Sequence, residues 1–447
     1  MTSQTYLLVD DALIARRQGV VRRAHACRKL AQPVLTPQKP WEGNRLYVYG
    51  TVLRDQAGGF RLWYMSNLGL TMYATSPDGL NWQRPELGIR DYEGSRANNI
   101  VYAMECPSVV IDPLEADVGK RYKMLGYVRK VGYHAAYSPD GLNWSAYPRN
   151  PVLTGDDTCT MSRDPQSGQF LLFHKLARVH NEKKRRLVYS SVSRDMQEWS
   201  PSRLALAPDE MDDRQTQAEG GLHSHFCNLS AFPWAGQWLG LVTHFRNSRR
   251  LEEASAGQSR DDGPIDVQLV HSRDGRDWHR CEDRSPVIPN APYPYDAGCI
   301  LGVANGPVIV GDEGWIYYTA INTTHGGALP EKKVTIAAAV WRVDGWVSLS
   351  AGPAGGIIQT VPLEAAGQRL VVNANAARGE LCAAVADPTG RPLDGYAMAD
   401  CRPVHGDHVR QAVAWKGRPA LPRRGRVSLR LQLSNADLFS YSLLDPL

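Results

Sequence analysis

Acidic and histidine side chains recur at one kind of position in this sequence, directly ahead of short apolar segments. These segments begin near residues 106, 158, 226 and 299, and the residues ahead of them are Glu105, Asp156, Asp157, Glu219, His223, His225 and Asp296. Carboxylates that gather in one place raise one another's pKa values, which costs stability unless a function uses the effect. Paired carboxylates suit acid–base chemistry, in which one acid gives a proton while the other activates water or attacks carbon.

A repeated phrase shows which strands must position these groups. Ser76-Pro77-Asp78-Gly79-Leu80-Asn81-Trp82 returns unchanged at residues 138–144, looser copies occupy 193–199 and 272–278, and a degenerate one lies at 343–346. Asp followed by Gly suits a tight turn between strands. Each unit has an apolar strand, an aromatic strand and a third strand that runs into the phrase. Five four-stranded units predict a five-bladed β-propeller, whose closure hides the sheet edges.

The units and the tail give the expected domains. We predict blades over residues 45–92, 98–150, 155–207, 222–288 and 298–350, within a propeller domain of residues 41–350. From residue 356 the pattern changes to short alternating strands, so residues 356–447 are predicted to form a β-sandwich. Residues 1–40 are expected to be an extended lead-in wrapped over the body. The predicted fold class is all-β, a five-bladed β-propeller followed by a C-terminal β-sandwich.

Composition agrees with this class and excludes several functions. The chain has 12 Trp, 19 Tyr, 40 Gly and 29 Pro, as aromatic strands between turns require. Basic residues are scattered and the net charge is only +5, which argues against a nucleic-acid partner. No apolar run is long enough to span a membrane. The N-terminus lacks the features of a secretory signal and the eight cysteines form no CxxC pair, so we expect reduced thiols in a cytoplasmic protein.

The geometry of a propeller blade decides which turns share a face with the acids. The start of the innermost strand and the turn between the second and third strands lie on one face. The repeated Asp-Gly turns lie on the other, so their Asp residues are expected to be structural. In the fifth unit the shared-face turn is 322–327, which brings His325 over the site. Its equivalent in the fourth unit is the loop 246–266, for which a lid, a subunit contact and an ordinary mobile loop stay open.

Further phrases carry a resemblance to a known group. They include Pro40-Trp41-Glu42-Gly43, Tyr49-Gly50-Thr51-Val52, Tyr295-Asp296-Ala297-Gly298 and the segments 8–11, 98–101, 344–349, 400–401 and 435–440. With the five units and the tail, the sequence resembles the five-bladed glycoside hydrolase superfamily, which includes the invertase/fructanase and arabinanase/xylosidase families. The closest resemblance, over nearly the whole chain, is to a bacterial group labelled family-32-like glycosyl hydrolase. It is specific for fold and less so for substrate, since one scaffold hosts many activities.

The resemblance implies candidates for the catalytic carboxylates. Asp157 and Asp296 come first, because both occupy positions that carry Asp in that group. The role of general acid is contested by three glutamates, Glu105, Glu42 and Glu219. The triplet Arg163-Asp164-Pro165 matches the invertase families, but here it closes the innermost strand instead of opening it. Asp164 is therefore expected in a turn on the opposite face.

Aromatic and histidine side chains are expected to contact the substrate. The aromatic platform that sugars favour would be supplied by Trp41, Tyr49 and Tyr295. His223 and His225 lie two apart, a strand spacing that places both on one side. A metal pair is one interpretation, but hydrogen bonding to a substrate or plain packing is favoured, so neither a metal nor another cofactor is expected. His225 could also donate a proton, and His325 is a further expected contact.

We therefore expect a glycoside hydrolase that cleaves a terminal sugar, with furanosides among the candidates, from a small oligosaccharide or glycoside. One alternative is a glycoside phosphorylase, which would need a basic phosphate pocket built from His223, His225 and Arg129 or Lys130. Another is a carbohydrate-binding propeller without catalysis. The expected partner is a carbohydrate and neither nucleic acid nor membrane, and formation of a homo-oligomer is left open.

Overall fold

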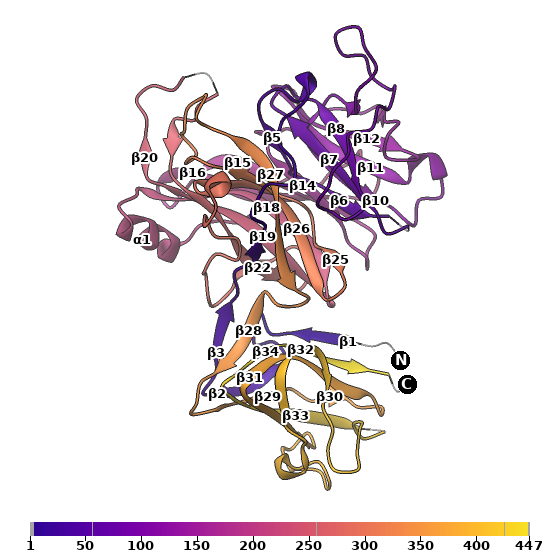
Figure 1. Cartoon of the computed structure of the whole chain (residues 1–447), viewed down its shortest axis with the longest axis vertical. Coiled ribbons are helices and arrows are strands. Elements are labelled where there is room, and N and C mark those ends of the chain that lie inside the picture. The colour runs from indigo at the N-terminus through magenta and orange to yellow at the C-terminus, as the bar shows by residue number, and fades with distance from the viewer. Residues whose placement is uncertain (1–3, 56, 256, 424, 446–447) are drawn as a thin grey trace.

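The structure is a computed structural model that describes residues 4–445 except 56, 256 and 424 (Figure 1). Strands dominate, and α1 (Glu210–Ala218) is the one α-helix among the described residues. The predicted all-β class is confirmed. Within the same residues, no helix is long and apolar enough to cross a membrane.

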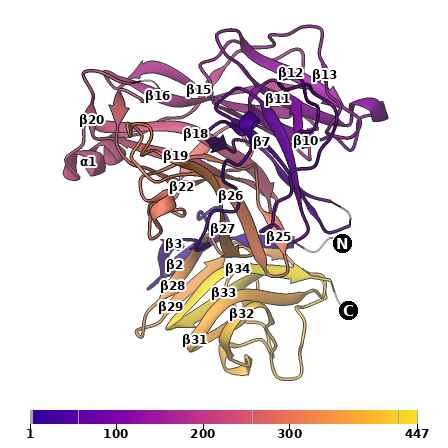
Figure 2. The same ribbon diagram turned by 45° about the horizontal axis from the view of Figure 1, so that its top comes forward.

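Small antiparallel sheets follow one another along most of the chain (Figures 1 and 2). The first sheet contains β5 (Leu46–Tyr47), β6 (Val52–Arg54), β7 (Phe60–Ser66), β8 (Thr71–Ser76) and β9 (Ile100–Tyr102). The second contains β10 (Glu105–Ile111), β11 (Tyr122–Val128), β12 (Gly132–Ser138) and β13 (Ser145–Ala146). The third contains β14 (Cys159–Arg163), β15 (Phe170–His180), β16 (Lys183–Ser193) and β17 (Arg203–Leu206).

Two further groups of strands complete this series. The fourth contains β18 (His223–Trp234), β19 (Gln237–Asn247), β22 (Ile265–Ser272) and β23 (Trp278–Arg280). The fifth contains β24 (Cys299–Val303), β25 (Val308–Val310), β26 (Glu313–Ile321), β27 (Val334–Arg342) and β4 (Arg28–Lys29). A single parallel bridge between Ile265 and Cys299 joins the two groups. The outermost strand of the fifth group, β4, thus comes from the opposite end of the chain.

Hydroxyl groups link each small sheet to the next one around the series, four of them from innermost segments and the last from β26. Each link is a side-chain hydroxyl that donates to a backbone carbonyl of the following sheet, and the last link returns to the first sheet. In order, the links are Thr51 to Val109, Ser108 to Met161, Thr160 to Leu229, Ser230 to Val303 and Thr319 to Val48. We call this set the hydroxyl ring. Since it returns to its starting point, it ties the five groups of strands to one another in chain order.

The repeated phrases form the turns that their sequence predicts. In the first copy, the backbone N–H groups of Leu80 and Asn81 donate to Asp78 Oδ1, both at 2.8 Å. Trp82 Nε1 donates to the carbonyl of Gly79 at 3.1 Å. The copies at 138–144, 193–199 and 272–278 repeat these bonds. Hydrogen bonds from the Asn81 backbone and side chain hold the pKa of Asp78 well below its usual range, as a structural carboxylate requires.

A separate, larger sheet lies below the series of small sheets (Figures 1 and 2). Its strand order is β2-β29-β33-β31-β34-β28-β3, and β1, β30 and β32 pair onto it. The bounds are β1 (Gln4–Leu7), β2 (Ile14–Gln18), β3 (Val21–Ala24), β28 (Val347–Ala351), β29 (Gly356–Thr360), β30 (Leu363–Glu364), β31 (Arg369–Ala386), β32 (Val404–Ala412), β33 (Arg426–Ser434) and β34 (Ala436–Leu444). The pairing differs from the predicted boundaries at two places. Residues 4–24 of the expected lead-in supply three strands, and β28 pairs here although 298–350 was predicted as a blade.

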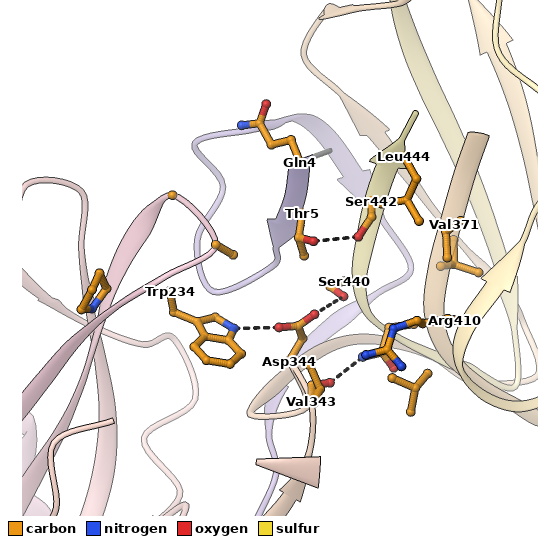
Figure 3. A pocket seen from close by; sticks show the side chains of 16 residues that line it. Gln4, Thr5, Trp234, Val343, Asp344, Val371, Arg410, Ser440, Ser442 and Leu444 are labelled. Atoms are coloured by element: carbon orange, nitrogen blue, oxygen red, sulfur yellow. Dashed lines mark hydrogen bonds between the residues drawn. The ribbon is translucent and has the colours of Figure 1, made fainter. Parts of the chain in front are cut away.

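A cavity of about 610 Å³ separates the two parts of the molecule near Asp344 (Figure 3). The Asp344 carboxylate accepts hydrogen bonds from Trp234 Nε1 at 2.7 Å and from Ser440 Oγ at 3.2 Å. On the large-sheet wall of the same cavity, the hydroxyls of Thr5 and Ser442, on the paired strands β1 and β34, lie 2.8 Å apart. Asp344 belongs to the degenerate fifth copy of the phrase, so this turn has become a junction with the large sheet.

Removing one link of the hydroxyl ring should destabilise the protein measurably. Thr319 both donates to the Val48 carbonyl and accepts from the Val48 N–H, at 3.1 and 2.9 Å. Thr319→Val keeps the shape and leaves two buried backbone groups without partners, so we expect a loss of about 2 kcal/mol in unfolding free energy. Urea denaturation would measure it, with Thr389→Val in an exposed turn as the control. Equal midpoints for the two variants would contradict the role of the ring.

Candidate active site

The end of the ring where the innermost strands begin has an uncharged floor. Four of these strands carry a buried cysteine there, Cys106, Cys159, Cys227 and Cys299. Burial raises the pKa of each of these thiols, so they stay protonated at neutral pH. All eight cysteines of the chain are free. Charged groups near this floor therefore have no ionised thiolate beneath them.

Asp157 is the carboxylate that stands open above this floor. It precedes β14, and its side chain keeps 44% of its surface exposed. Both carboxylate oxygens lie close to Lys175 Nζ, at 2.6 and 2.7 Å. Burial among neighbouring segments would raise the pKa of Asp157, but the Lys175 ammonium and the Thr158 N–H outweigh it and hold the pKa below its ordinary value. Asp157 is therefore ionised at neutral pH. It is accessible from the open end above the cysteine floor, which we call the mouth.

Phe245 gathers three polar side chains from three sheets. Its ring is fully buried on β19. The Arg186 guanidinium lies 5.2 Å from the ring centroid, and the imidazoles of His225 and His325 lie 5.2 and 4.9 Å from it. We call Phe245 and these three residues the Phe245 cluster. Because one rigid ring orients all three groups, they are held in place before any ligand binds.

His325 presents a free nitrogen at the mouth. Its Nδ1–H donates to the carbonyl of Asp261 at 3.0 Å, which leaves Nε2 as the acceptor of the neutral imidazole. Burial and then the nearby Arg186 charge lower the pKa of His325 to about 4. At neutral pH this residue can therefore accept a hydrogen bond from a hydroxyl group, and it is not a proton donor.

His225 is engaged on both nitrogens. Its Nδ1 accepts from the Arg186 N–H at 3.0 Å. Asn247, oriented so that its amide nitrogen donates to the carbonyls of Arg249 and Asp262, turns Oδ1 toward His225 Nε2 at 3.3 Å. Burial and then Arg186 lower the pKa of His225 to about 2. Because the imidazole is neutral at neutral pH and both nitrogens are bonded, the structure gives no support to the predicted role as a proton donor. His225 instead joins the backbone of Arg186 to the side chain of Asn247.

His223 stacks on His225 with ring centroids 4.7 Å apart, as the strand spacing predicted. Burial and then the Arg185 charge lower the pKa of His223. Among the described residues, no group of three or more His, Cys, Asp or Glu side chains is placed to hold a metal ion.

The two loops over the site are tied to each other. The backbone N–H of Gly326 donates to Asp262 Oδ1 at 2.8 Å, and Gln258 Nε2 donates to the Gly326 carbonyl at 2.5 Å. Lys332 Nζ donates to the His325 carbonyl at 2.8 Å. These bonds fix Gln258 and Asp262 of the loop 246–266 against Gly326, which argues against an ordinary mobile loop at these residues.

Glu105 and Tyr49 border the same mouth. Glu105 is largely buried, and its Oε1 lies 2.6 Å from Nη2 of Arg129, whose own side chain is 69% exposed. Tyr49 is buried and stacks on Tyr47 with centroids 6.4 Å apart. Burial raises the Tyr49 pKa far above its usual range, and the charge of Asp157 adds to the effect, which places the phenol near that carboxylate.

Asp296 lies elsewhere. Its carboxylate is fully buried, with Oδ2 2.5 Å from Lys29 Nζ and 2.7 Å from the Tyr318 hydroxyl, which donates to it. Lys29 also donates to the carbonyl of Ala291. The expected convergence of Asp157 and Asp296 is not observed. Lys29, on β4, forms a buried ion pair with Asp296 and keeps its carboxylate away from the mouth.

Glu42 and Trp41 are also held in structural contacts. Glu42 is fully buried, and Tyr64 and Arg84 donate to its Oε1 at 2.7 and 2.6 Å. Two backbone N–H groups donate to Oε2. Trp41 donates from Nε1 to Asn99 at 2.7 Å. Both residues therefore brace the entry to the first sheet.

Glu219 and Tyr295 complete the predicted set, and both lie away from the Phe245 cluster. Glu219 caps the C-terminal end of α1, half-exposed and 3.4 Å from Arg246. The Tyr295 hydroxyl donates to the Leu30 carbonyl at 2.6 Å, and burial raises the pKa of Tyr295 to about 12.

Sequence reasoning misses four residues of this site, Lys175, Arg186, Phe245 and Asp261. The one available signal is the basic run 183–186. Alternate residues of a strand face opposite sides. Lys183 and Arg185 accordingly contact Asp213, at 3.3 and 3.0 Å, while Arg186 turns toward Asp261 at 3.0 Å.

Comparisons with known proteins add matches in structure alone. No family model and no curated protein matches the chain. A thermostable family-43 glycoside hydrolase is 12% identical with a TM-score of 0.45, over 70% of this chain and 93% of the other. Bombyx mori GH32 beta-fructofuranosidase BmSUC1 is 11% identical with a TM-score of 0.41, over 93% and 94%. Exo-inulinase from Aspergillus awamori is 12% identical with a TM-score of 0.41, over 93% and 99%.

The matches include glycoside hydrolases, as the resemblance in sequence implies. The TM-scores quoted above lie below 0.5, so these matches do not indicate an activity for this chain.

Lys175→Met should raise the pKa of Asp157, because the ammonium that offsets burial is removed. A carbon-13 NMR titration, with the signal assigned through Asp157→Asn, would measure the change. Lys333→Met removes an exposed charge and serves as the control. An unchanged Asp157 titration in Lys175→Met would show that the ion pair does not set the protonation state.

Proposed function

We propose that the protein is a glycoside hydrolase of the five-bladed propeller class, with the five small sheets as blades and the large sheet as a β-sandwich domain. The hydroxyl ring, which returns to the first sheet, supports closure of the propeller. The main support for this activity is the state of Asp157, whose ionised carboxylate is open to the mouth and is held by Lys175.

In the proposed reaction, Asp157 acts as the ionised partner. Hydrolysis of a glycosidic bond passes through a state with positive charge on the sugar ring. A carboxylate kept ionised by Lys175 can stabilise that charge, and it can activate water or attack the anomeric carbon. Either role requires Asp157 to stay deprotonated, as its lowered pKa favours.

Glu105 is the proposed proton donor. Among the predicted acids it borders the same mouth as Asp157, whereas Glu42 is enclosed by donors. Its partner Arg129 is largely exposed, so a substrate can displace that contact and reach the Glu105 carboxyl group. Protonation of the leaving oxygen by Glu105 would complete the pair of carboxyl groups that the reaction needs.

The substrate is proposed to be a terminal sugar of a small oligosaccharide, with furanosides as the first class to test. His325 Nε2 would accept a hydrogen bond from a sugar hydroxyl, and Tyr47 and Tyr49 would form the aromatic wall. The proposed location is the cytoplasm, which the eight free thiols support.

A glycoside phosphorylase is the second candidate, because Lys175 and Arg186 place two cations beside Asp157. In that reaction phosphate instead of water would take the sugar. Phosphate-dependent turnover would distinguish the two.

Asp157→Asn and Glu105→Gln should each lower kcat by about 1,000-fold on a cleaved glycoside, since each removes one of the two carboxyl groups. A panel of aryl furanosides and pyranosides, assayed with and without phosphate, would find that glycoside. Asp164→Asn is the matched control, because Asp164 accepts bonds only within its own turn, at 3.1 Å from the N–H groups of Gln166 and Ser167. Full activity of Asp157→Asn would overturn the assignment, and binding without any turnover would favour a non-catalytic protein.

A further inference from the structure

A second cavity, of about 300 Å³, adjoins the Phe245 cluster, and Asp157 is not among its lining residues. Arg186 and His225 belong to both, so the cavity and the mouth share a wall. The strands β16, β18 and β20 (Arg249–Arg250) frame it, and β16 and β20 lie side by side in both views (Figures 1 and 2). None of the proposed steps of hydrolysis uses this cavity.

Positive charge is in excess in this cavity. Its lining includes Lys184, Arg186 and Arg250 against the single carboxylate of Asp261. Asp261 lies 3.0 Å from Arg186 and 3.7 Å from Arg250, so one anion serves two guanidinium groups. Arg185 also lines the cavity, but Asp213 neutralises it from the other side at 3.0 Å. The remaining charge is therefore about two positive units.

Buried nitrogen atoms in this wall lack partners among the described residues. Arg186 Nη1 and His223 Nε2 are both shielded from solvent and form no hydrogen bond there. A buried guanidinium N–H without an acceptor is costly, and a charge-assisted bond to an oxyanion would remove that cost. The unpartnered guanidinium N–H of Arg186 and two uncompensated charges in one cavity are the complement of a group with several anionic oxygens, and His223 Nε2 can donate to such a group when it carries the imidazole proton.

We infer that this cavity binds an oxyanion, the carboxylate or phosphate group of an anionic ligand, with Arg186 and His223 as its buried contacts and Lys184 and Arg250 at its rim. The inference rests on the proposed function in one respect: if Asp157 cleaves a glycoside, the shared wall makes the substrate an anionic sugar or makes phosphate a co-substrate. Arg186 would then position the anion relative to Asp157.

Calorimetric titration of the full chain with glucuronate, inorganic phosphate and glucose tests the site without any turnover. We expect binding of at least one of the two anions and none of glucose. Phosphate alone would identify a phosphate group, and glucuronate alone a carboxylate sugar. Absence of binding by both anions would overturn the inference.

Arg186→Gln and Arg250→Gln should each raise the dissociation constant of the bound anion at least 10-fold. Arg250 is 68% exposed, so its variant keeps the fold even if Arg186→Gln unfolds. Arg178→Gln is the matched control, since Arg178 lies on β15 with the same charge and donates only to the carbonyl of Ala177. If Arg178→Gln weakened anion binding equally, the anion would be held by the overall positive charge, and the inferred binding site would be overturned. Anion binding without hydrolysis of any glycoside would refute the proposed function alone, and hydrolysis of neutral glycosides without anion binding would refute this inference alone.

Discussion

The hydroxyl ring is the constraint on which the rest of the molecule depends. Five short hydroxyl side chains each reach the backbone of the next sheet, so adjacent innermost segments are fixed at hydrogen-bond distance. A free sheet edge would instead invite pairing with another chain. Once these segments are fixed, the residues at the start of β10 and directly before β14 are brought to a common mouth, whereas Glu42 and Asp296 are held in buried contacts of their own. The site thus depends on the links between sheets more than on any single loop.

Unequal strand lengths give the mouth its shape. β14 has five residues, whereas its neighbours β15 and β16 have 11 each, and β18 and β19 have 12 and 11. The longer strands overhang the floor and carry Lys175, Arg186 and Phe245 above it. These residues lie within regular strands, so their side chains are oriented by the sheets and not by mobile loops.

Local signals in the sequence were sufficient for the scaffold and for part of the site. The repeated turns were predictable because Asp78 and Gly79 act on neighbouring backbone groups. The shared-face rule predicts Asp157 and His325 at one end, and the charges of Lys175 and Arg186 act on both groups. Asp296 shows the limit, because its partner Lys29 lies 267 positions away and nothing near Asp296 signals the pairing. Phe245 was missed for a similar reason, since an aromatic residue in a strand looks the same whether it fills a core or orients a site.

The strand β4 has a consequence for how the protein is made. Residues 28–29 precede their partner strand β27 (Val334–Arg342) in the order of synthesis, and most of the small sheets are made between the two. During vectorial synthesis the third and fourth sheets can form while β4 still waits, and the large sheet needs residues from both ends of the chain. The nascent chain therefore holds an unpaired segment through most of translation. Assembly of both parts of the molecule is a late event that follows release of the last strands from the ribosome.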